Sequence, residues 1–151
     1  MDAIRFLKQA HEEAKSIFRQ IEQASEQERG ALWEKLEPEL KLHEKMEEAH
    51  LYGPVADDAA REDATLREWK TQHHDEVREA EAMIGEIDGL DPSDAEWMEM
   101  VTELKETLEH HIQEEEQDIW PKIQHVWDRD RLEQAGAQME VMKRTEARRA
   151  A

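Results

Sequence analysis

Apolar residues recur along this chain at intervals of three, four or seven, which is the spacing of one face of an α-helix. The first apolar series occupies positions 4, 7, 14, 18 and 21, and the second occupies 32, 36 and 40. The third occupies 66, 69, 77, 80, 84 and 87, and the fourth occupies 97, 101, 104 and 108. No segment alternates apolar and polar residues as a half-buried strand does. The pattern predicts an all-α protein with four amphipathic helices.

Glycine and proline separate these helices. The chain has five glycines and four prolines, and most lie at positions 30, 53–54, 89–92 and 121. The segments between them accommodate helices of roughly 20–28 residues, which predicts an up-down antiparallel four-helix bundle. Ser93 followed by Glu96 predicts a capping box at the start of the fourth helix. Trp120-Pro121 predicts its end, because proline disfavours a helical conformation in the residue before it.

A shorter fifth helix is predicted at 129–146. Its apolar stripe is weak and consists of Leu132, Ala135, Met139 and Met142. We expect this stripe either to cover the bundle or to bind a partner protein or a second copy of the chain. The predicted division is therefore a bundle in residues 1–125 and a C-terminal helix with a basic tail in residues 126–151.

Histidines and glutamates continue the apolar stripes of three helices. His11 continues the first stripe, His43 and Glu47 continue the second, and His111 and Glu115 continue the fourth. Residues four apart lie on the same helix face, so each His-x-x-x-Glu pair points inward. Burying an unpaired carboxylate is costly, and no lysine or arginine lies beside these residues on the stripes. A bound metal cation is therefore predicted.

The third helix offers two adjacent histidines, His73 and His74. The apolar stripe alone centres on His73. A comparison with the first helix favours His74, because apolar residues follow both His11 and His74 at +3, +6 and +10. We predict His74 as the metal ligand and keep His73 as the alternative. Four further residues are open as additional ligands, and these are His50, Glu44, Tyr52 and Asp118.

Composition excludes several other functions. The chain of 151 residues is long enough for one domain, and its formal net charge of −19 would repel nucleic acid. It has no run of eighteen apolar residues for a membrane span and no cysteine for a disulfide or a thiolate metal site. A cytoplasmic protein fits these observations.

The residue types narrow the choice of metal. Four imidazoles and two carboxylates suit iron, zinc, manganese or copper better than calcium or magnesium. Two ions that share two bridging carboxylates would use this many side chains better than one ion would. A ferritin-like site requires Glu-x-x-His on two helices, but only Glu47 and His50 have that spacing on an inward stripe. The pattern therefore disfavours a ferritin-like site.

His11 and the segments "HEKMEEAHLY", "HHDEVRE" and "HIQEEEQDIWPKI" resemble the hemerythrin HHE cation-binding domain. The resemblance covers roughly residues 3–125. It implies a four-helix bundle that holds two non-haem iron ions, bridged by an oxo or hydroxo group, and that binds dioxygen, nitric oxide or peroxide. Carried over by position, the implied ligands are His11, His43, Glu47, His74, His111 and Glu115.

The chain departs from the oxygen carriers of this family in one position. Those proteins have a second histidine on the third helix, one turn before the first. Here that position is Lys70, or Trp69 if His73 is the ligand. Fewer imidazoles leave more coordination positions open, which favours catalase-like peroxide decomposition in stress defence over oxygen carriage. The alternatives are sensing or carriage of oxygen or nitric oxide, and metal storage without catalysis.

Overall fold

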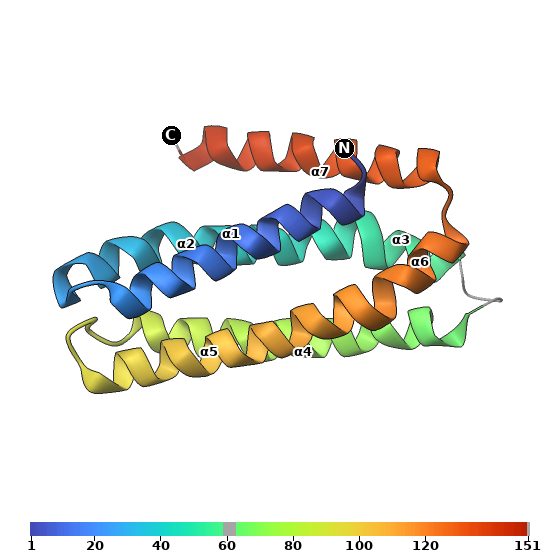
Figure 1. Ribbon diagram of the computed structural model, residues 1–151. Coiled ribbons are helices and arrows are strands. Elements are labelled where there is room, and N and C mark those ends of the chain that lie inside the picture. Colours follow the sequence, from blue (N-terminus) through green and yellow to red (C-terminus); the bar gives the residue numbers. More distant parts are fainter. Residues whose placement is uncertain (59–62, 151) are drawn as a thin grey trace.

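The computed structural model describes residues 1–58 and 63–150, and none of them lies in a β-strand (Figure 1). Seven α-helices and two π-helical turns, η1 and η2, make up this part of the chain. In chain order they are α1 (Ala3–Gln23), α2 (Glu26–Glu47), η1 (Glu48–Tyr52), α3 (Gly53–Asp58), α4 (Ala64–Asp88), α5 (Ala95–Glu114), η2 (Glu115–Ile119), α6 (Trp120–Val126) and α7 (Arg129–Ala150).

Four long arms form the predicted up-down bundle. The first arm is α1, the second is α2 continued by η1 and α3, the third is α4, and the fourth is α5 continued by η2 and α6. The antiparallel pair α1 and α2 faces the antiparallel pair α4 and α5, and α7 lies along the outer side of α1 (Figure 1). The predicted all-α fold with a four-helix bundle and a C-terminal helix is confirmed.

The predicted capping box at Ser93 is wrong. Helix α5 begins at Ala95 with Asp94 as its N-cap, and that cap makes no side-chain hydrogen bond. The hydroxyl of Ser93 instead donates to the Asp91 carboxylate over 2.7 Å, and the Ser93 backbone N–H donates to the same oxygen over 2.9 Å. Asp91 therefore closes a local turn that competes with the cap for the serine side chain.

The predicted end of the fourth helix at Trp120-Pro121 is also wrong, because a π-turn carries the helix past the proline. The backbone N–H of Trp120 donates to the carbonyl of Glu115, five residues back. The second arm repeats this arrangement before Pro54, where the N–H of Gly53 donates to the carbonyl of Glu48. Proline offers no N–H and would clash with a carbonyl four residues back, and the wider turn relieves that conflict.

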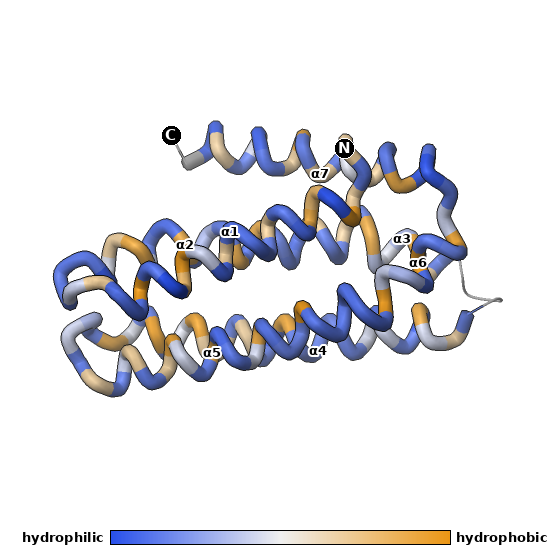
Figure 2. The backbone as a smooth tube through the Cα atoms, in the orientation of Figure 1, coloured by the Kyte–Doolittle hydropathy of each residue, from blue (hydrophilic) through white to orange (hydrophobic). Residues whose placement is uncertain are grey.

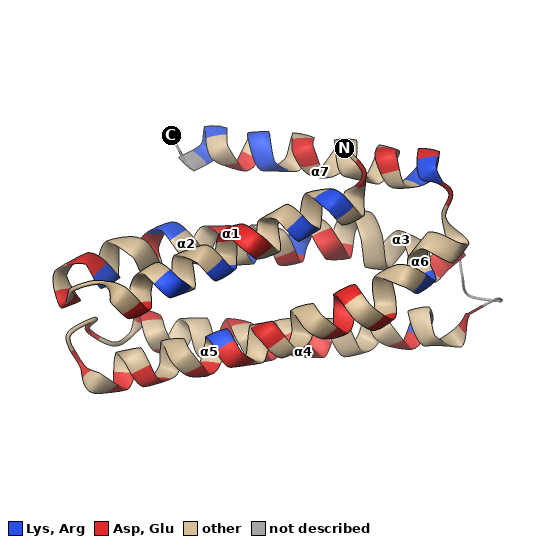
Figure 3. Cartoon of the chain, in the orientation of Figure 1, with Lys and Arg blue, Asp and Glu red and all other residues tan. Residues whose placement is uncertain are grey.

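The apolar core consists of two clusters on either side of a polar layer. One cluster surrounds Trp33 and Trp97 at the end where α1 joins α2. The other surrounds Tyr52, Trp69 and Trp120 near η1 and η2, and it includes residues of α7. Apolar residues recur along every arm and form the buried core, and acidic residues are distributed along the long helices (Figures 2 and 3). The polar layer between the clusters contains the candidate site.

Helix α7 packs against the bundle through Leu132, Ala135 and Met139, which are at most 7% exposed. Gly136 permits the close approach, because a Cβ atom there would lie 2.0 Å from the carbonyl oxygen of Met1. The helix continues to Ala150, four residues beyond the predicted end, and its last part is rich in basic residues (Figure 3). Among the described residues, no helix has both the length and the apolar character needed to cross a bilayer.

Candidate metal centre

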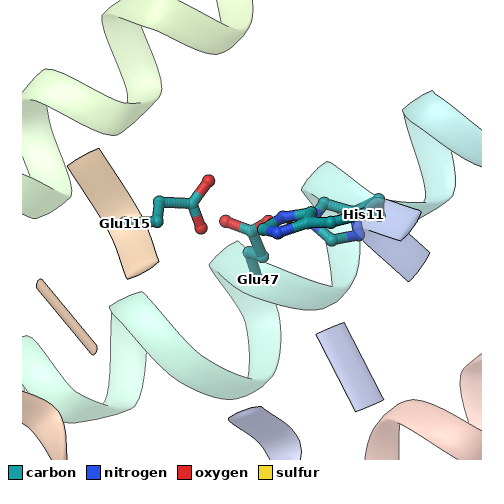
Figure 4. Close-up of side chains that lie close together, drawn as sticks. His11, Glu47 and Glu115 are labelled. Atoms are coloured by element: carbon teal, nitrogen blue, oxygen red, sulfur yellow. Dashed lines mark hydrogen bonds and ion pairs between the residues drawn. The ribbon is translucent and has the colours of Figure 1, made fainter. Parts of the chain in front are cut away.

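Six inward-facing donors meet in the polar layer. Helix α1 supplies His11, α2 supplies His43 and Glu47, α4 supplies one histidine, and the fourth arm supplies His111 and Glu115. The two glutamates are completely buried, and the side chains of His43 and His111 are each 14% exposed. The carboxylates of Glu47 and Glu115 face one another, with His11 beside Glu47 (Figure 4).

The donors form two groups that share one carboxylate. The possible ligand atoms of His11, His43, Glu47 and Glu115 all lie within 4.8 Å of one another. Those of Glu47, His73 and His111 form a second such group. Glu47 therefore belongs to both groups, and Glu115 connects them as well, because its Oε1 lies 2.6 Å from His111 Nε2.

The histidine of α4 that faces the other donors is His73, so the prediction that His74 faces them is wrong. Nε2 of His73 lies 3.1 Å from Glu47 Oε2, and the His73 side chain is 1% exposed. The side chain of His74 is 59% exposed and contacts Glu48 on the outside. His73 lies one turn from both Trp69 and Val77 on the buried face, so the apolar stripe was the correct guide.

Carboxylates outside the layer contact the outer nitrogens of three histidines. Nδ1 of His11 lies 3.3 Å from Glu116, Nδ1 of His111 contacts Glu76, and Nδ1 of His73 lies 3.7 Å from Glu48. Such contacts favour the tautomer that leaves Nε2 free to bind a metal. The apolar periodicity does not identify these three glutamates. Glu76 could have been noticed from its spacing of three from His73, whereas Glu116 is hidden in an acidic run.

Aromatic side chains enclose the layer on the side of η1 and η2. Trp120 stacks on the His11 ring at 5.1 Å, and Trp69 stacks on the His111 ring at 5.7 Å. The hydroxyl of Tyr52 donates to Glu115 and accepts a hydrogen bond of 3.0 Å from Trp120 Nε1. The wider turns bring Tyr52 and Trp120 to the inner face five residues after their glutamates. His50 and Asp118, in contrast, belong to neither donor group.

Charges within the layer shift the protonation of its members. Burial alone would raise the pKa of Glu47, but the charge of His43 and the close imidazole rings of His11, His43 and His73 lower it well below its usual value. Burial lowers the pKa of His111, but Glu115 outweighs this effect and the pKa rises to about 11. The pKa of His43 rises for the same reason, through Glu47. Protons and a metal cation therefore compete for the same atoms.

The layer fits a metal better than it fits a hydrogen-bonded network. Both carboxylate oxygens of Glu47, Oε1 of Glu115 and both ring nitrogens of His73 are buried without a well-formed hydrogen bond. Buried polar atoms are nearly always satisfied, and converging unsatisfied donors are typical of a site that binds a cation. Imidazole nitrogen with carboxylate oxygen suits iron, manganese, zinc or copper.

A cavity connects this layer with the surface. It has a volume of about 90 Å³ and is lined by the donors His11, His43, His111 and Glu115. Its walls are mainly apolar and include Phe18, Leu40, Leu108 and Ile112. Its lining also includes charged side chains, among them Lys15 and Lys105. Since one water needs about 10–15 Å³ on this measure, the cavity holds only small molecules.

Comparisons with known proteins agree with this geometry. The sequence model of the hemerythrin HHE cation binding domain matches residues 2–123. No curated protein matches the chain. Among solved structures, the chain is similar to the crystal structure of a hemerythrin HHE cation binding domain-containing protein from Mycobacterium kansasii. The two chains are 26% identical, the TM-score is 0.78, and the alignment covers 96% of this chain and 89% of the other.

Proposed function

This chain belongs to the hemerythrin HHE cation-binding domain family, and on that premise we propose that it holds two iron ions and decomposes hydrogen peroxide. The observation that supports two ions most directly is the presence of two donor groups that share Glu47. His11 and His43 would hold one ion, His73 and His111 would hold the other, and Glu47 and Glu115 would supply the carboxylate ligands. The hydroxyl of Tyr52 donates a hydrogen bond to Glu115, and tyrosine is also a side chain that can bind iron.

When bound, a pair of iron ions supplies two-electron redox chemistry, which is the electron count for reducing one peroxide to water and oxidising another to dioxygen. The protein's own residues prepare the site for this. Glu116 and Glu76 hold the His11 and His111 rings by their outer nitrogens. The narrow cavity admits small oxidants such as peroxide. It excludes larger reducing molecules that would otherwise react with the oxidant at the site.

The position of Trp69 favours peroxide decomposition over oxygen carriage. With His73 as the donor on α4, Trp69 lies one turn earlier, where the oxygen carriers have their additional histidine. Its ring is 2% exposed and stacks on His111, so it occupies this space without offering a ligand atom. A site with four histidines leaves more positions for peroxide than a site with five.

The apolar walls of the cavity support a second candidate function, which is reversible binding of dioxygen or nitric oxide for carriage or sensing. Both gases partition into apolar surroundings, and Phe18, Leu40, Leu108 and Ile112 provide such surroundings next to the donors. Only the first candidate function converts peroxide to water and dioxygen, so an assay of oxygen evolution from peroxide distinguishes the two.

The test is oxygen evolution from hydrogen peroxide by iron-loaded protein, with His111→Ala as the variant that lacks one donor. We expect evolution by the wild type and little by the variant. Equal rates for the two proteins would contradict the assignment of the site. A stable, reversible oxygen adduct without oxygen evolution from peroxide would favour carriage or sensing instead.

A further inference from the structure

A partly buried carboxyl lies beside the donors but belongs to neither donor group. Glu44 follows His43 on α2, and its Oε2 atom is inaccessible to solvent and has no hydrogen-bond partner. Buried carboxyl oxygens usually have a partner, because leaving water without a replacement hydrogen bond is costly. The hydrogen-bond partner of Glu44 Oε2 is therefore expected to be a small molecule that enters the space beside it.

Two cavities meet at this carboxyl. The first is the cavity of about 90 Å³ that reaches the donors between α1, α2 and α5. The second, of about 150 Å³, lies between α4 and α5 and is lined by Glu76, Val77 and Thr107. Glu44, Leu108 and His111 line both. A small molecule in either cavity therefore shares that cavity with both His111 and the Glu44 side chain.

Small oxidants differ in what they offer to such a group. Hydrogen peroxide has two O–H donors and also accepts hydrogen bonds, whereas dioxygen and nitric oxide have no donor. An ionised carboxylate accepts from peroxide, and a carboxylic acid both donates and accepts, so peroxide satisfies Glu44 in either protonation state. A molecule without an O–H or N–H group can displace water from Glu44, but it cannot donate the hydrogen bond that the water donated.

We propose that Glu44 binds the O–H group of hydrogen peroxide beside the donors and makes the site selective for peroxide over dioxygen and nitric oxide. This inference rests on the proposed function and adds a specificity-determining residue to it. Glu44 acts on the ligand and not on the metal, since its oxygens lie outside both donor groups. Its removal should therefore change peroxide binding while iron and nitric oxide binding persist.

The experiment compares Glu44→Leu, which removes the hydrogen bond, with Glu44→Gln, which retains a hydrogen-bonding side chain. Glu13→Leu is the control, because Glu13 is an exposed carboxylate that lines the same cavity. We would measure iron content, the Kd of nitric oxide by spectral titration and the apparent KM of peroxide. Glu44→Leu should raise the KM ~10-fold, the size of one hydrogen bond to a ligand. Iron content and the Kd of nitric oxide should stay within about twofold of the wild type.

The two other variants should resemble the wild type. An unchanged KM in Glu44→Leu would overturn the proposal, and so would equal weakening of peroxide and nitric oxide binding. Loss of iron from both Glu44 variants would show that Glu44 holds the metal instead. If the wild type evolves no oxygen, the proposed function fails, and the Kd of peroxide replaces the KM in the same comparison. Absence of any peroxide binding would then contradict the role of Glu44 as well.

Discussion

His73 and His74 are adjacent in the sequence, but an α-helix turns their side chains about 100° apart. His73 faces Glu47, and His74 is exposed. We expect His73→Ala to lose about half or more of the bound iron, because it removes a donor from one of the two groups. His74→Ala is the matched control and should retain its iron. Metal analysis of both variants, with helical content checked by circular dichroism, measures this. The opposite ranking would refute the placement of the site.

Periodicity predicted the donor positions of three helices and also indicated the correct histidine on α4, but we predicted the other one. The apolar stripe favoured His73, but similarity to the first helix favoured His74. That similarity misled because the buried face of α4 continues from His73 at +4, +7 and +11, at Val77, Ala80 and Ile84, and not at the spacing of α1. The outer carboxylates could not be predicted, since they depend on how neighbouring helices are rotated.

Metal binding should release protons from the histidines that become ligands. The pKa values of His43 and His111 are raised in the folded protein, so their pairing with glutamate stabilises the metal-free protein below pH about 6.5. This contribution is lost as pH rises through the raised values, for His111 at about 11. A metal ion needs the neutral ring, so loading at pH 7 should release about one proton or more per ion.

A pH-stat titration of metal-free protein with ferrous iron under anaerobic conditions measures this release. The same competition predicts that iron leaves the protein as pH falls. Binding of iron without release of protons at pH 7 would show that the histidines are neutral before the metal arrives, contrary to their raised pKa values.

At the scale of the elements, each π-turn lies at a donor glutamate and precedes a proline, since η1 follows Glu47 and η2 begins with Glu115. η1 brings Tyr52 to Glu115, and η2 brings Trp120 to His11. The prolines were visible in the sequence and predicted helix ends. The sequence could not show that the helices continue past these prolines. The wider turn is stabilised by the packing of Tyr52 and Trp120 in the assembled core, which involves residues distant in the sequence.

Gly53 is the residue whose substitution tests η1. A Cβ atom there would lie 2.6 Å from the Glu48 carbonyl oxygen, so Gly53→Ala should destabilise the protein by about 1–3 kcal/mol. Gly85→Ala is the control, since no atom lies within 4 Å of its Cβ position and alanine is the better helix former by about 0.5–1 kcal/mol. Urea unfolding should show opposite signs for the two variants. A stabilised Gly53→Ala would contradict the close approach.

At the scale of the whole molecule, the polar layer divides the apolar core and is enclosed by it. The four-helix bundle followed from periodicity and from the spacing of glycine and proline. The packing of α7 did not, because its weak stripe was compatible with either the bundle or a partner. In the structure Leu132, Ala135 and Met139 are buried within the chain. Association through the remaining surface of α7, like the cytoplasmic location, stays a prediction.

The central claim is that two donor groups sharing Glu47 hold two ions, and the number of iron ions per chain tests it most directly. Protein produced with ample iron should contain about two irons per chain, by the count of two groups, and should absorb in the near-ultraviolet as a bridged diferric pair does. One iron or fewer per chain, with zinc as the dominant metal, would contradict this account.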